Sequence, residues 1–177
     1  MQSSQRHLQA ARTLAAIAIA GLALAGCGGG DSSTGTAPLQ IFTATPDTAK
    51  GDLQIISPGT VQDSGVSDAN GRWNPVGGPH DYCRVTASGL RNSGDKQNYS
   101  IVVVFSLADR SLSSVVLSSP GFEVSAFGPS TRFSVDTAKR TINFDRLQLN
   151  GTGQAASLFG PLDYPNQSLT IGRPTCG

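Results

Sequence analysis

The strongest pattern in the sequence is a run of β-branched and aromatic residues, NYSIVVVFSL, at positions 98–107. Its apolar residues divide between the two faces of a strand, with Ile101, Val103, Phe105 and Leu107 on one face and Val102 and Val104 on the other. Because neither face is polar, both must be covered by other parts of the protein. The pattern therefore predicts a central strand.

A second apolar stretch, LSSVVLSS at positions 112–119, follows after the short polar segment 108–111. This spacing predicts an antiparallel hairpin with a turn at 108–111. The facing pairs expected from it are Leu107 with Leu112, Val104 with Val115, and Val103 with Val116.

A further hairpin is predicted from 131–135 through the turn 136–139 to 140–149, with Asp136 suited to the first position of a type I turn. In the return strand, Ile142 and Phe144 have one parity and Leu147 and Leu149 have the other. A regular strand would send these two pairs to opposite faces. We therefore expect a β-bulge or a bend at Asp145 and Arg146.

Additional short strands are expected near positions 53–56, 82–88, 122–127, 155–159 and 167–171. Each is bounded by Gly, Pro, Asn or Asp, and no segment of this region has a convincing amphipathic helical pattern. Many short strands with frequent turns predict an all-β fold, an antiparallel β-sandwich or a barrel-like domain. The roughly 130 residues involved suit a single domain, which we place at 50–177.

The N-terminal region has a different order. Arg6, His7 and Arg12 form a short positive segment, and the twelve residues from Leu14 to Ala25 carry no charge. This run is too short to span a bilayer, which needs roughly 20 apolar residues, and it has the length of a signal-peptide h-region. The alternative is a buried N-terminal helix, but the run has no polar face to meet water.

The four residues Leu24-Ala25-Gly26-Cys27, which overlap the end of this run, resemble the lipobox of bacterial lipoproteins. The resemblance implies that residues 1–26 are a lipoprotein signal peptide, removed before Cys27. It also implies that the Cys27 sulfur receives a diacylglyceryl group and that the new amino group is acylated, for example with palmitate. Because two or three acyl chains hold a protein firmly, Cys27 would anchor the chain to a membrane.

The position after the cysteine influences sorting in that family, where Asp favours retention in the inner membrane. Here that position is Gly28, so the resemblance implies the outer membrane of the cell envelope as the location. Residues 27–49 follow as the lipidated cysteine and a linker, and the Gly-, Ser- and Thr-rich stretch 28–38 predicts a flexible tether. The mixed segment 39–50 could extend this tether or begin the domain.

Charge and cysteine content narrow the partners and the compartment. Removal of residues 1–26 lowers the 13 Lys and Arg residues to 11, against 12 Asp and Glu, with no basic cluster. Nucleic acid is therefore not an expected partner. With Cys27 lipidated, Cys83 and Cys176 remain, and in an oxidising compartment we expect them to form a disulfide rather than stay as two buried thiols.

The sequence offers little catalytic chemistry. His80 is the single histidine after residue 26, and no catalytic serine elbow, zinc-ligand pattern or phosphate-binding loop occurs. No catalytic residue, metal site or cofactor is assigned. The candidate binding surface is the Gly- and Pro-rich segment 70–83, with Trp73, His80, Asp81 and Tyr82. The alternative is that Trp73 and Tyr82 cap the core while His80 and Asp81 point into water.

Two classes of function remain. The first is a lipid-anchored envelope protein whose small β domain is a non-catalytic binding or structural accessory module, with an envelope protein or glycan as its partner. The second is a small envelope hydrolase that uses His80 as its base. The absence of a recognisable nucleophile context favours the first class.

Overall fold

The computed structural model describes residues 38–66, 81–164 and 176. Most of them lie in nine antiparallel strands, and one short 3-10 helix, η1 (Asp47–Ala49), follows the first strand. The strands are β1 (Gln40–Thr45), β2 (Gly51–Val66), β3 (Tyr82–Asn92), β4 (Asn98–Ser106), β5 (Leu112–Ser119), β6 (Phe122–Phe127), β7 (Phe133–Asp136), β8 (Thr141–Gly151) and β9 (Gln154–Asp163). The all-β prediction is confirmed.

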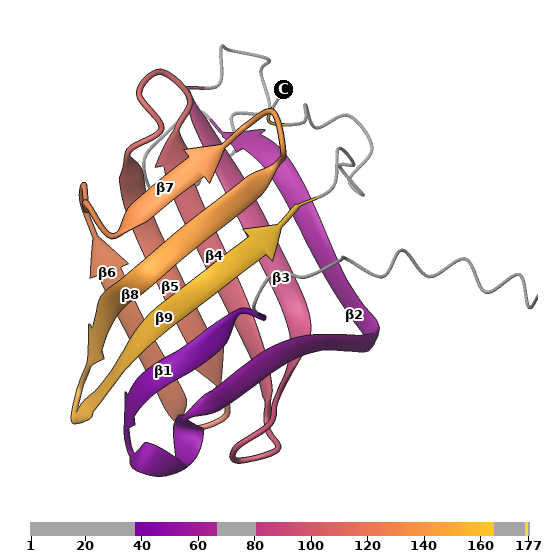
Figure 1. Cartoon of the computed structure of the whole chain (residues 1–177), viewed down its shortest axis with the longest axis vertical. Helices are drawn as coiled ribbons and strands as arrows, with labels where there is room; N and C mark the ends of the chain where they lie inside the picture. The colour runs from indigo at the N-terminus through magenta and orange to yellow at the C-terminus, as the bar shows by residue number, and fades with distance from the viewer. Residues whose placement is uncertain (1–37, 67–80, 165–175, 177) are drawn as a thin grey trace, which may run out of the picture. The chain divides into compact units, whose positions relative to one another are not determined.

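The strands form a closed barrel. Eight of them pair in the order β6-β5-β4-β3-β2-β1-β9-β8, and a pairing between β6 and β8 completes the ring. The ninth strand, β7, pairs with β8 beyond the point where β6 leaves it. Figure 1 shows β7, β8, β9 and β1 crossing the front of the barrel, with β3, β4 and β5 behind them.

The inside of the barrel is filled by apolar side chains. An eight-stranded ring is just wide enough for inward-facing residues to pack against one another. The most deeply buried members of this core include Ile41, Val85, Ile101, Val103, Phe105, Leu117, Leu149 and Leu158. Burial of these residues is the main source of stability for the fold.

The hairpin of β4 and β5 forms as a central pair, but the predicted register is wrong by one residue. Val103 faces Val115, and Val102 faces Val116. The strand ends at Ser106, whose carbonyl accepts a hydrogen bond from the Arg110 N–H at 3.0 Å, so Leu107 lies in the turn. Residues that face each other share one side of a sheet. The observed pairing joins the two fully buried valines at 103 and 115.

The predicted hairpin of β7 and β8 forms, but its turn lies at 137–140, one residue later than predicted, and Val135 faces Ile142. The expected bulge is also confirmed, because the pairing of β8 with β9 shifts between Asp145 and Leu147. Arg146, at the bulge, has a left-handed backbone with φ of 54°. The extra residue brings the apolar residues on both sides of it to the same buried face.

The start of the β domain differs from the sequence prediction. Strand β1 lies within residues 27–49, the range assigned to the linker, yet it pairs with β9 from Gln40↔Phe159 to Thr45↔Ala155. Residues 40–49 therefore belong to the barrel, and the boundary predicted at residue 50 is too late. The strand expected at 167–171 lies outside the described residues.

Candidate functional site

The structure confirms the expected disulfide between Cys83 and Cys176, whose Cα atoms are 5.3 Å apart. Of the predicted binding surface, Asp81 and Tyr82 lie at the start of β3, directly before Cys83. Trp73 and His80, like Cys27, lie outside the described residues. The structure therefore places only one end of the predicted surface.

A buried carboxylate lies beside the disulfide. Asp63 of β2 is 1% exposed, and its Oδ2 accepts a hydrogen bond of 3.0 Å from the backbone N–H of Cys176. The Arg140 guanidinium lies 3.9 Å from the same oxygen. Asp63 thus ties the C-terminal segment to the barrel at the same place as the disulfide.

Two open hollows flank this end of the barrel and share Leu107. The first, of about 530 Å³, is lined by Asp81, Tyr82, Ser106, Leu107 and Ala108. The second, of about 600 Å³, is lined by Leu107, Arg110, Thr137, Ala138, Arg140, Tyr164 and Cys176. Burial raises the pKa of the Tyr164 hydroxyl above its ordinary value. Asp81 and Ser106 both line the first hollow, where the Ser106 hydroxyl accepts hydrogen bonds from the Ala108 and Asp109 N–H groups at 3.2 and 3.4 Å.

The third hollow lies at the seam where the barrel closes. Among the described residues, β6 meets β8 at one facing pair, Ser125 with Asn150. Pairing along β8 resumes only where the Asp145 N–H donates to the Arg132 carbonyl at 2.9 Å and β7 begins. Between these points the chain at 126–131 separates from β8. We call the resulting opening, of about 610 Å³, the seam hollow.

Both ends of the seam hollow are held by defined contacts. Beyond the pair of Ser125 and Asn150, the Gln154 amide accepts a hydrogen bond from the Glu123 N–H at 2.8 Å and donates one to the Gly121 carbonyl at 2.7 Å. This side chain fastens the start of β6 to the start of β9. The opening is therefore a fixed gap in the barrel wall rather than a frayed edge.

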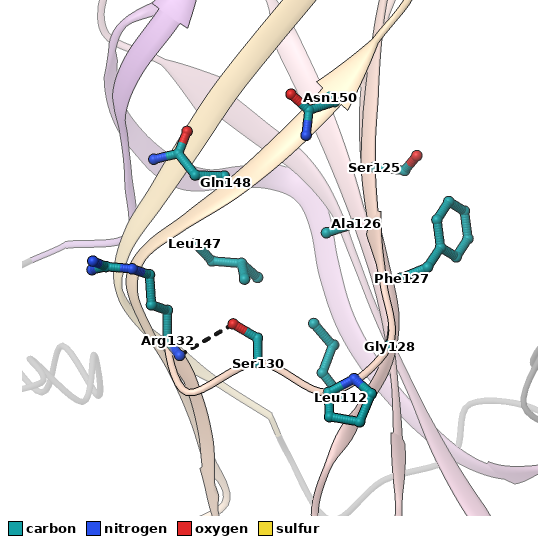
Figure 2. Close-up of a pocket in the computed structure, with 11 residues that line it drawn as sticks. Leu112, Ser125, Ala126, Phe127, Gly128, Ser130, Arg132, Leu147, Gln148 and Asn150 are labelled. Carbon is teal, nitrogen blue, oxygen red and sulfur yellow. Dashed lines mark hydrogen bonds between the residues drawn. The ribbon is translucent and has the colours of Figure 1, made fainter.

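The seam hollow has an apolar centre and a polar margin. Figure 2 shows Leu112, Ala126 and Leu147 around its centre. Leu112 and Leu147 are buried, with exposed fractions of 2% and 3%. The margin is formed by neutral polar side chains together with one cation and one exposed aromatic residue: Ser125, Ser130, Gln148, Asn150, Arg132 and Phe127.

Arg132 forms an ion pair with Asp145. Its Nη1 donates to the Asp145 carbonyl at 3.1 Å and lies 3.7 Å from the Asp145 carboxylate. The remaining polar groups of the margin are hydroxyls and amides, which both donate and accept hydrogen bonds. Among the lining residues that the structure describes there is no carboxylate, imidazole, thiol or amine that could activate Ser125 or Ser130 as a nucleophile.

Sequence reasoning did not find the seam hollow. Its two walls come from Ser125–Arg132 and from Leu147–Asn150, and nothing in either segment indicates that they face each other across a gap. The available signal was Gly128-Pro129 directly after an apolar strand, which predicts a break in pairing. Gly128 indeed has a left-handed backbone with φ of 82°.

The comparisons give no relative for this chain, because no protein-family model, curated protein or solved structure matches it. Within the described ranges, no helix is long and apolar enough to cross a membrane. Over the same residues, no cluster of three or more His, Cys, Asp or Glu side chains is arranged to hold a metal ion.

Proposed function

We propose that this chain is a lipid-anchored protein of the bacterial cell envelope, held at the outer membrane through Cys27, and that its barrel is a non-catalytic binding module. The lipobox-like residues 24–27 support the anchor. The seam hollow is the observation that carries the binding role, because it is an open cavity with an apolar centre and a margin of hydrogen-bonding side chains.

The margin of the seam hollow favours a neutral, polyhydroxylated ligand, and we assign an envelope glycan as its partner. Gln148 and Asn150 each present an amide that can donate to one hydroxyl and accept from another. Arg132, the one cation among the described residues of the lining, is paired with Asp145, so these residues offer no free charge for an ionic ligand.

The anchor is tested by replacing Cys27 with Ser. We expect the wild-type protein to fractionate with membranes and its N-terminal peptide to carry the mass of a diacylglyceryl group and an additional acyl chain. The Cys27→Ser variant should lack both modifications and remain unprocessed. An unmodified Cys27 in the wild-type membrane fraction would contradict the proposal.

The glycan site is tested with neutral oligosaccharides released from envelope glycan as the probe. We expect Gln148→Ala and Asn150→Ala each to weaken binding about fivefold, the loss of roughly one hydrogen bond of 1 kcal/mol. Asn143→Ala is the matched control, because Asn143 is an exposed amide on the same strand and lies outside the seam hollow. Binding can be measured by titration calorimetry.

Equal losses in all three variants would place the ligand elsewhere. Hydrolysis of the probe that disappears in a His80→Ala variant would instead support an envelope hydrolase.

A further inference from the structure

Two β-bulges face each other across strand β9. The pairing of β1 with β9 shifts between Ile41 and Thr43, and the pairing of β8 with β9 shifts between Asp145 and Leu147. Both shifts occur at the same level, because Ile41 and Leu147 are each paired with Leu158. The two extra residues are therefore Phe42 and Arg146, one on each side of β9. Bulges commonly redirect a side chain in this way.

The redirected side chains meet on the outside of the barrel. The Arg146 guanidinium carbon lies 4.8 Å from the centre of the Phe42 ring, a cation–π arrangement. The Phe159 ring lies beside them, with its centre 6.1 Å from that of Phe42. Phe42 remains 42% exposed and Arg146 is exposed. We call Phe42, Arg146 and Phe159 the bulge platform.

The bulge platform presents an exposed cation, Arg146. Over the described residues Arg146 takes part in no ion pair, whereas Arg132, near it on the same wall, is paired with Asp145. A guanidinium stacked on a ring keeps its N–H groups directed outward, where they can bind phosphate oxygens. The platform thus joins exposed aromatic surface to an anion-binding group.

The position of the bulge platform in the chain indicates which surface it contacts. It includes β1, the first strand after Cys27, and Gln40 lies 13 positions after that cysteine. Even a fully extended chain of that length spans only about 45 Å. Aromatic rings and arginine are the side chains favoured at the boundary between lipid and water, and anionic headgroups attract cations there.

We propose that the bulge platform docks the barrel onto the anionic phospholipid surface to which Cys27 anchors it. This inference rests on the proposed anchor. A lipid on Cys27 alone holds the barrel near the membrane but does not orient it. The platform fixes the orientation of the barrel, because Phe42 and Phe159 contact the boundary between lipid and water and Arg146 binds headgroup phosphates. Phe127, the most exposed large apolar residue described at 76%, lies on β6, which is three strands from Phe42 of β1 and meets β8 at Asn150 rather than at the bulge, and it stays in water.

The experiment attaches the chain from Cys27 onward to vesicles by coupling the Cys27 thiol to a maleimide phospholipid. With Cys83 and Cys176 in a disulfide, Cys27 is the reactive thiol. Phe42→Trp and the matched control Phe127→Trp are each made in a Trp73→Phe background. Quenching by brominated lipid then reports which tryptophan reaches the bilayer, in vesicles of phosphatidylglycerol and phosphatidylcholine and in vesicles of phosphatidylcholine alone.

We expect quenching of Phe42→Trp in the anionic vesicles to be at least twice that of Phe127→Trp. Adding Arg146→Gln to Phe42→Trp should lower the ratio of docked to undocked protein about fivefold, which is the effect of one cation near an anionic surface. Adding Arg146→Lys instead keeps the positive charge and should leave this ratio largely unchanged. Circular dichroism checks that each variant folds. Equal quenching at the two positions, or no loss with Arg146→Gln, would overturn the proposal.

Because the coupling is made in vitro, this result does not depend on natural lipidation of Cys27. Failure of the anchor would appear separately, in the mass of the natural N-terminal peptide.

Discussion

Replacing Cys83 and Cys176 together by Ala is expected to lower the free energy of unfolding by about 2–5 kcal/mol. The disulfide joins residues 93 positions apart, so its loss frees a long loop in the unfolded chain. The Cys83 side chain is also fully buried, and the Cys176 N–H binds the buried Asp63. Urea denaturation of the wild type and of the double variant measures the difference.

Reduction provides the control for this prediction. A thiol reductant should shift the unfolding midpoint of the wild type toward that of the double variant, and should leave the double variant unchanged. A double variant as stable as the oxidised wild type would show that the disulfide adds nothing to the fold.

Local patterns predicted the β7–β8 hairpin well. The change of parity between Phe144 and Leu147 requires one extra residue if both are to be buried, and the structure places it at Arg146. Asp136 also acts as the turn residue expected of it, since its Oδ1 accepts the Lys139 N–H at 2.9 Å. The residues that predict the bulge and the turn lie within a few positions of them in the sequence.

The same reasoning placed the β4–β5 hairpin but missed its register. Valines occupy both faces of β4, so an apolar pattern fits two registers almost equally. The choice between them is made by the turn, where Arg110 has a left-handed backbone with φ of 60° and Ser106 and Ser111 are joined by a hydrogen bond. Arginine gives no sequence signal for that conformation.

Features that depend on distant segments could not be predicted. Strand β1 has mixed polarity and is followed by Pro46, and its stability comes from pairing with β9, more than a hundred residues away. The seam hollow likewise depends on where β6 meets β8. The bulge at Arg146 was expected, but its meeting with Phe42 requires a second bulge in β1 at the same level of β9.

The interior packing of the barrel leads to the other large effect, which is expected for Phe105→Ala. Phe105 is fully buried, and its ring lies 6.4 Å from that of Phe133 and 6.3 Å from that of Tyr164. Truncation removes buried apolar surface and leaves a cavity that the closed ring of strands cannot collapse around, so we expect a loss of about 3–5 kcal/mol. Phe127→Ala makes the same chemical change at a residue that is 76% exposed and should change stability by about 0.5 kcal/mol or less. Urea denaturation of both variants gives the comparison, and losses of similar size would mean that the barrel interior is not packed around Phe105.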